Sequence, residues 1–136
     1  MDQPSDNPKV NFYQDLCKLI QDCQHHDPHC IHIIKGDWNE SCQGSSTSAK
    51  LCQKFELVDA WSHTHPNTEF RSHQQGSSCI DSVLTLPWLA QHMHMIYKQF
   101  SHRLRGNHQG LYLDIPKSIL FGNTQNPIFP QQSRRL

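Results

Sequence analysis

Apolar residues recur every three or four positions over residues 8–24, a spacing that predicts an amphipathic helix. Asn7 and Pro8 support this start, because asparagine is a favoured N-cap and proline is well tolerated at the first helical position. The apolar stripe consists of Phe12, Leu16, Leu19, Ile20 and Cys23. One face of this helix should therefore pack on the rest of the protein.

Shorter apolar runs predict β-strands. The run at residues 30–35 is rich in β-branched residues and predicts a buried strand. Residues 68–72 and 78–84 predict the two strands of a hairpin joined through Gln75-Gly76. The other predicted elements are a short helix at residues 50–55, a short helix from Pro87, a weak strand at residues 95–100 and a strand at residues 111–115. This mixture of helices and strands predicts the α/β fold class.

The end of the hydrophobic pattern sets the expected domain boundary. Beyond Pro116 no period is visible, so we expect an irregular basic tail over residues 116–136. Residues 8–115 then form a single domain, since a chain of 136 residues suits one domain. Hydrophobic residues make up only 35% of the chain and the mean hydropathy is −0.70, which predicts a modest core.

Charge is distributed unevenly along the chain, although the formal total is zero. Residues 1–97 hold six Lys or Arg and eleven Asp or Glu, a net charge of −5. Residues 98–136 hold six Lys or Arg and one Asp, a net charge of +5. A basic segment beside an acidic one is typical of a protein that binds a polyanion, and a solvated basic tail is the equally simple alternative.

Cysteine usage and hydropathy bear on the compartment. The six cysteines include no C-x-x-C pair, and the sequence shows no signal peptide, so reduced thiols are expected. No apolar run approaches the ~20 residues that cross a bilayer. We therefore expect an intracellular protein, nuclear or cytoplasmic, with no membrane association.

Histidine is abundant, with eleven residues. His25, His26, His29 and Cys30 lie close enough in sequence to suggest a zinc site. Pro28 interrupts them, however, and no second pair at zinc-ligand spacing follows. Surface histidines in a loop between helix and strand are the favoured interpretation, and a zinc protein is the alternative.

Three short segments place polar groups where a strand meets a loop. The first is Gly36-Asp37-Trp38-Asn39, in which Asp37 and Asn39 should share a face because alternate residues of an extended chain do so. The second contains Asp81 within an apolar run, where a carboxylate needs a partner because its desolvation is costly. The third contains His108, a suitable partner, since a carboxylate orients an imidazole and favours its charged form.

Together these side chains suit phosphodiester hydrolysis. Asp37 could orient or deprotonate the attacking water, and Asn39 could donate a hydrogen bond to a phosphate oxygen. An Asp81–His108 pair could stabilise charge on the phosphoryl group. A divalent metal ion usually assists such chemistry, and oxygen ligands favour magnesium. Each segment taken alone is also compatible with a structural role, such as a turn at Gly36-Asp37-Trp38-Asn39.

Four motifs occur in a fixed order along the chain: Gly36-Asp37-Trp38-Asn39-Glu40, Leu57-Val58-Asp59-Ala60, Cys79-Ile80-Asp81-Ser82-Val83-Leu84 and Gly106-Asn107-His108-Gln109-Gly110-Leu111. In this order they resemble the carboxyl half of the endonuclease/exonuclease/phosphatase domain, the fold shared by DNase I and the apurinic endonucleases. The versions carried by reverse-transcriptase retroelements are most similar, with the pattern G-D-F-N-E, L-V-D, R-x-D-Y-I-L and S-D-H-R-G. The resemblance covers roughly residues 10–122.

The resemblance implies a four-layered α/β sandwich that cuts phosphodiester or phosphomonoester bonds with Mg²⁺. Asp37 and Asn39 match the family's catalytic Asp and Asn. Asp81 matches the acid that supports the catalytic histidine, and His108 matches that histidine. Asn107 occupies the position of a family Asp that lies at the metal centre.

The sequence departs from the family at this metal centre. Neutral Asn107 replaces an acid, and the family's amino-terminal half, which supplies a metal-binding Glu, has no counterpart before Asn11. Loss of one preorganised electrostatic group can cost ~10²–10³ in rate. We therefore expect weak magnesium binding and a partial sandwich that lacks its amino-terminal half. The expected function is that of a truncated nuclease relative of retroelement origin, with little or no hydrolysis of its own.

Two expectations about partners follow. An uncovered sheet face favours self-association or pairing with the missing amino-terminal half, because layered folds depend on such burial. The basic segment, with Lys98, Arg103 and Arg105, favours nucleic acid. A module that binds nucleic acid without cutting it is therefore the alternative function.

Overall fold

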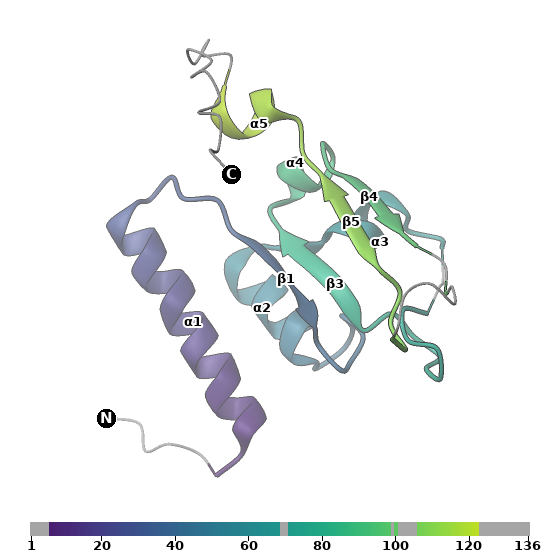
Figure 1. The fold of residues 1–136 in the computed structure, drawn as a ribbon. Helices are drawn as coiled ribbons and strands as arrows, with labels where there is room; N and C mark the ends of the chain where they lie inside the picture. The colour runs from purple at the N-terminus through teal and green to yellow at the C-terminus, as the bar shows by residue number, and fades with distance from the viewer. Residues whose placement is uncertain (1–5, 69–70, 99, 101–105, 123–136) are drawn as a thin grey trace, which may run out of the picture.

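The computed structural model describes residues 6–68, 71–98, 100 and 106–122 (Figure 1). Helix α1 spans Pro8–His26, so the predicted helix is confirmed and extends two residues further. The side chain of Asn7 accepts a hydrogen bond from the backbone N–H of Lys9 at 3.0 Å, as expected of an N-cap. The buried residues of α1 are Cys17 and Ile20, whereas Leu19 remains 59% exposed.

A three-stranded antiparallel sheet lies at the centre of the fold. Its strands are β1 (Ile33–Asp37), β3 (Asp81–Thr85) and β2 (Val58–Asp59), in the order β1-β3-β2. Strand β1 starts three residues later than the predicted run at 30–35. The reason lies in its partner, because Ile33 pairs with Thr85, and β3 ends there before Pro87 starts the next helix.

Two helices connect these strands, and a third follows β3. Helix α2 spans Thr47–Phe55 and starts three residues earlier than predicted, because the Ser46 side chain caps it by accepting the Ala49 N–H. Helix α3 spans Ala60–Thr64 and helix α4 spans Pro87–Ala90, the latter as predicted from its proline.

A second sheet contains β4 (His94–Tyr97) and β5 (Leu111–Asp114), which pair antiparallel. Both strands were predicted, β4 with a start at residue 95. The irregular tail expected from residue 116 is wrong for its first part, since helix α5 spans Lys117–Phe121. Ile119 and Leu120 pack against the core there, so burial stabilises a helix that is too short to show a period.

The strand predicted at residues 78–84 is confirmed in part as β3, but its predicted hairpin partner at residues 68–72 is not a strand at the positions that the structure describes. Within residues 68–84, the structure describes a strand only from Asp81 onward, and residues 69 and 70 lie outside the described residues. The buried Ser72 Oγ accepts the backbone N–H groups of Ile80 and Asp81, at 2.8 and 3.0 Å. A side chain therefore takes the place of the expected strand ladder.

Two cores lie on opposite faces of the three-stranded sheet. One contains Leu84 of β3 together with the buried residues of α1 and α2, and the other contains Val83 of β3 with α3, α4 and the second sheet. Figure 1 shows α1 on the β1 side and the β4–β5 sheet on the other side. The α/β class is thus confirmed, as layers of helix, sheet and sheet.

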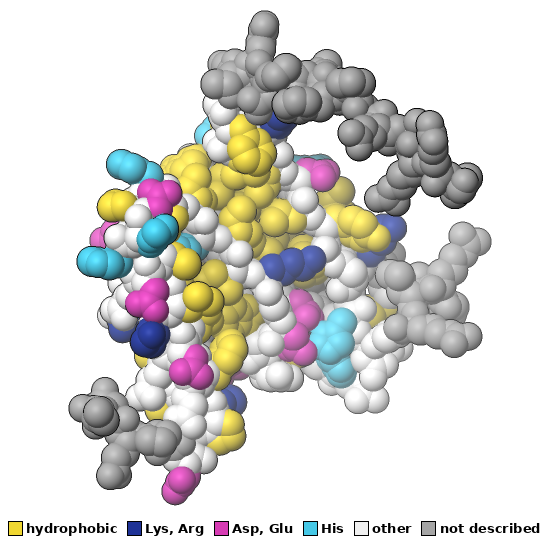
Figure 2. Space-filling model, turned by 60° about the vertical axis from the view of Figure 1, so that its left-hand side comes forward, with side chains coloured by type: hydrophobic (Ala, Val, Ile, Leu, Met, Phe, Trp, Pro, Cys, Tyr) yellow, Lys and Arg dark blue, Asp and Glu magenta, His cyan; other side chains and the backbone are white. Residues whose placement is uncertain are grey.

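Hydrophobic side chains gather on the face of the molecule seen in Figure 2. Ile33 of β1 and Tyr112 of β5 are among the large hydrophobic residues with exposed side chains, at 37% and 49%. Among the described helices, none is long and apolar enough to span a membrane.

Candidate functional site

The register of the central sheet brings two acidic residues together. Asp37 is the last residue of β1 and Asp81 is the first residue of β3, and the two are cross-strand partners. The site therefore lies where the carboxyl end of β1 meets the amino end of β3. In an antiparallel pair, the end of one strand meets the start of the next.

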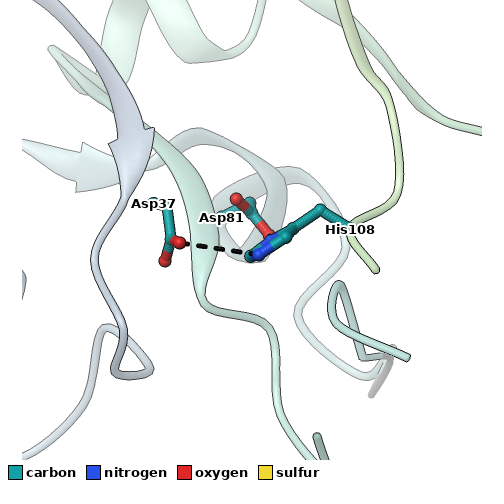
Figure 3. Close-up of side chains that lie close together, drawn as sticks. All are labelled: Asp37, Asp81 and His108. Carbon is teal, nitrogen blue, oxygen red and sulfur yellow. Dashed lines mark hydrogen bonds and ion pairs between the residues drawn. The ribbon is translucent and has the colours of Figure 1, made fainter. Parts of the chain in front are cut away.

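His108 completes the group from a loop that precedes β5. Its Nδ1 lies 2.8 Å from Asp81 Oδ2, and its Nε2 lies 3.7 Å from Asp37 Oδ2. Figure 3 shows the three side chains directed toward one another. An ionised carboxylate only accepts hydrogen bonds, so Nδ1 carries a proton and donates a hydrogen bond to Asp81. The predicted Asp81–His108 pair is confirmed, and the structure brings Asp37 to the same place.

Electrostatics favour a charged imidazole at this position. The hydrogen bond with Asp81 raises the pKa of His108 above its ordinary value, partial burial opposes this rise, and the charges of Asp81 and Asp37 add to it. The His108 side chain is 40% exposed, so solvent screens these interactions. The group nevertheless favours an imidazolium flanked by two carboxylates.

A shared set of backbone contacts holds Asp81 and the His108 loop in place. Besides its Oγ bonds at the start of β3, Ser72 accepts the Gln109 N–H through its carbonyl at 2.7 Å. The Tyr97 hydroxyl donates to the Asp81 carbonyl at 2.7 Å. Next to Ser72, His73 forms an isolated bridge with His108.

Sequence reasoning missed Ser72 and Tyr97. Tyr97 lies in a predicted strand, and the sequence offered one signal there, because a buried tyrosine hydroxyl needs a hydrogen-bond partner. Ser72 carried no signal in the sequence, because its role depends on which backbone groups reach it after folding.

Asn39 lies beside the group, but not as predicted. Strand β1 ends at Asp37, and Asn39 has a left-handed backbone with φ of 55°. Its backbone N–H donates to Asp37 Oδ1 at 2.8 Å, which forms a turn that fixes the Asp37 carboxylate. The alternation expected to place both side chains on one face therefore stops at Asp37, and contact of the Asn39 side chain with phosphate stays a prediction.

The other predicted residues have varied positions. Asn107 is exposed, and its carbonyl accepts the Gln74 N–H at 2.6 Å. Lys98 follows β4, with its Nζ 4.6 Å from the centre of the Tyr112 ring. Arg103 and Arg105 lie outside the described residues.

The alternative zinc cluster is not assembled in the part of the chain that the structure describes. There, the metal-ligating side chains that come within 4.8 Å of one another in a group of three are Asp37, Asp81 and His108. Cys30 instead contacts His32, with 3.4 Å between Sγ and Nε2. Surface histidines remain the simpler account of His25, His26 and His29, which are all exposed.

The donor set at Asp37, Asp81 and His108 does not fit a resident magnesium ion. Mg²⁺ requires near-octahedral oxygen coordination, usually from carboxylates and waters. Here one Asp81 oxygen is already bonded to the imidazole, and a protonated His108 repels a cation. Asn107, in the loop that carries His108, is neutral and adds no charge.

What these groups can do is bind and orient an oxygen. With 3.7 Å between His108 Nε2 and Asp37 Oδ2, one oxygen atom fits within hydrogen-bond distance of both. A phosphate oxygen could accept from the imidazolium, and a water could donate to Asp37.

Comparison with known proteins adds no relative: no family model matches the sequence, and no curated protein matches it.

Proposed function

We propose that the protein is a relative of the endonuclease/exonuclease/phosphatase family, of the type carried by retroelements, with little phosphodiester hydrolysis of its own. Its fold would be part of the DNase I-like sandwich. The proposal is supported by the motifs and by the meeting of Asp37, Asp81 and His108, which come from three different motifs. An acid–imidazole pair with a second acid opposite is suited to phosphoryl chemistry.

Each residue has a defined role in this proposal. His108 donates from Nε2 to a phosphate oxygen and stabilises charge that develops there. Asp81 accepts a hydrogen bond from Nδ1 and so orients the imidazolium ring with its Nε2–H directed at the ligand. Asp37 accepts a hydrogen bond from the attacking water, with its other oxygen fixed by the Asn39 N–H.

Weak hydrolysis follows from the same group. The leaving oxygen and the phosphate both develop negative charge, and enzymes of this chemistry commonly neutralise it with a metal ion. Magnesium is expected to bind weakly here, since Asn107 is neutral and Asp81 is already bonded to His108.

A cleavage assay tests the proposal. We expect plasmid DNA and an abasic-site duplex to be cut slowly or not at all in magnesium buffer. Asn107→Asp alone should not restore turnover, because one acid does not complete an octahedral oxygen site. Robust magnesium-dependent cleavage that Asp37→Ala abolishes would overturn the view that hydrolysis is weak.

The assignment to a phosphate site is tested separately. Inorganic phosphate should shift the His108 ring signals in NMR spectra of the wild-type protein at a pH where the imidazole is charged. In the wild type, phosphate should also shift the signals of the neighbouring Asp37 and Asp81. In His108→Ala, phosphate should no longer shift these two signals. Unchanged wild-type spectra at high phosphate would reject the site.

Binding of nucleic acid without cleavage is the second candidate. It is favoured by Lys98, whose ammonium group lies over the exposed Tyr112 ring, because basic and aromatic side chains together suit single strands. Arg103 and Arg105 would add phosphate contacts. Affinity for a single-stranded oligonucleotide should then fall steeply with salt. A response that is flat between low and moderate salt would remove this candidate.

A further inference from the structure

Two thiols lie close together where the loop that follows β1 packs against helix α2. Cys42 lies in this loop, and Cys52 lies in α2, with their Sγ atoms 3.7 Å apart. Both side chains are partly buried and both cysteines are reduced. The proximity is part of the fold, since Cys42 and Cys52 both pack against the core that contains Leu51 and Leu84.

We propose that Cys42 and Cys52 form a redox-active pair that closes to a reversible disulfide when the protein meets a peroxide. A disulfide has an S–S distance of about 2.05 Å. The present separation of 3.7 Å between the two sulfur atoms must therefore shorten by less than one S–S bond length. Cys42 can make this movement, because residues 41–46 form bends and a turn without helix or strand. The inference does not depend on the proposed function.

The surroundings of the pair distinguish the two thiols. A hydrogen bond from Cys52 lowers the pKa of Cys42, burial opposes this, and a hydrogen bond from the Ser48 hydroxyl lowers it further. The Cys52 pKa is raised, by its contact with Cys42 and by burial. Cys42 also lines two surface hollows, of which Cys52 lines only one. Since the thiolate is the reactive form and Cys42 has the greater access, Cys42 is the attacking residue and Cys52 is the resolving residue.

Access to the pair is open on one side. Cys42 lines a hollow of about 270 Å³ together with Asp59, Ser62 and Cys79. Its lining is mainly polar, which suits a small hydrophilic oxidant. Cys42 and Cys52 also line a neighbouring hollow with His63, so both residues border space that is open to solvent.

The chemistry balances in two steps. The Cys42 thiolate attacks one peroxide oxygen, the O–O bond breaks, and hydroxide leaves and takes up a proton, which gives a sulfenic acid and water. The Cys52 thiol then attacks the sulfenic sulfur, the S–O bond breaks, and a second water leaves as the S–S bond forms. Two thiols lose two electrons, and one peroxide gains them. A small thiol such as dithiothreitol reverses the reaction by exchange.

The bond would affect the candidate site through the chain. The loop that carries Cys42 starts at Asn39, and Glu40 within it accepts the Thr47 N–H at the start of α2. A disulfide would tie this loop to α2 at a second point. Oxidation should therefore slow exchange of the amide hydrogens between residues 39 and 46.

Peptide mapping tests the proposal directly, because trypsin separates the two cysteines. Cleavage after Lys35, Lys50 and Lys54 gives peptides 36–50 and 51–54, with one cysteine each. After brief treatment with hydrogen peroxide and alkylation of free thiols, we expect these two peptides joined, with a mass two hydrogen atoms below their sum. Dithiothreitol should separate them.

Two variants sharpen the test. Cys52→Ser should stop the reaction at the sulfenic acid on Cys42, which a 1,3-diketone reagent labels. Cys23→Ser removes an exposed thiol that lies apart from the pair and should leave the joined peptides unchanged. Cross-links that instead join Cys23 or Cys79 to other cysteines, or a Cys42 that stays alkylatable after peroxide, would overturn the proposal.

Discussion

At the scale of single residues, the main feature is a group of three polar side chains, Asp37, Asp81 and His108, at the end of β1. His108 lies between two carboxylates that come from neighbouring strands. Its contact with Asp81 is a charge-assisted hydrogen bond at 2.8 Å, the kind that is stronger than a neutral one. Asp37 lies further away, at 3.7 Å, so it acts mainly through its charge.

The pKa of His108 should fall when Asp81 loses its charge. Asp81→Asn removes the hydrogen bond to a carboxylate that raises this pKa, and NMR titration of the imidazole protons would measure the fall. Asp15→Asn, in an exposed position on α1, is the matched control and should leave the titration unchanged. An Asp81→Asn protein whose His108 titrates as in the wild type would contradict the assignment.

The same pair predicts how stability depends on pH. In the folded protein the His108 pKa lies above the unfolded value of about 6.5. The stabilisation is therefore complete below about pH 6.5 and is lost as the pH rises through the folded pKa. Urea unfolding should show a difference in the free energy of unfolding between wild type and Asp81→Asn. This difference should narrow as the pH rises from about 6.5 through the folded pKa of His108. Asp15→Asn should show no such trend.

At the scale of elements, local signals predicted the helices better than the pairing of strands. Asn7 and Pro8 specify the start of α1, and Pro87 specifies α4, because caps and prolines act within a few residues. Strand register depends on a distant partner, so the positions of Ile33 and Asp37 in β1 could not be read from their own segment. The polar segments singled out in the sequence did contain Asp37, Asp81 and His108, which lie together in the fold, whereas the contacts of Ser72 exist only after folding.

Ser72 connects three segments, and its replacement should show this. Ser72→Ala leaves the N–H groups of Ile80 and Asp81 without their acceptor, at a cost of about 1–3 kcal/mol in the free energy of unfolding. Urea denaturation measures this cost. Ser77→Ala in the adjacent exposed loop should change stability by less than about 0.5 kcal/mol. Equal effects of the two changes would show that the Ser72 hydroxyl has no such role.

At the scale of the whole molecule, the sheet has an open side. The order β1-β3-β2 leaves β1 at an edge, and among the described residues no strand pairs with its outer side. Ile33, on this strand, is partly exposed, and Figure 2 shows apolar surface on the same side of the molecule as α1. Exposed edge strands with apolar side chains readily accept another strand.

Self-association through β1 is therefore expected, and a charge should suppress it. The apparent mass in sedimentation experiments should rise with wild-type concentration, and Ile33→Lys should lower this rise, because lysine on an edge discourages pairing. Leu19→Lys adds the same charge on the exposed side of α1 and is the matched control. A wild-type protein that stays monomeric at every concentration would reject the prediction.

One lysine joins the two sheets and leads to a different kind of consequence. The ammonium group of Lys35 on β1 donates to the Leu111 carbonyl on β5 at 2.9 Å. Lys35 lies two residues before Asp37, and Leu111 lies three residues after His108. This hydrogen bond therefore helps to set the distance between Asp37 and His108. Acylation of the amine would remove its charge and lengthen the side chain. A reagent or enzyme that acylates lysines would thus change the spacing between Asp37 and His108 without modifying either residue.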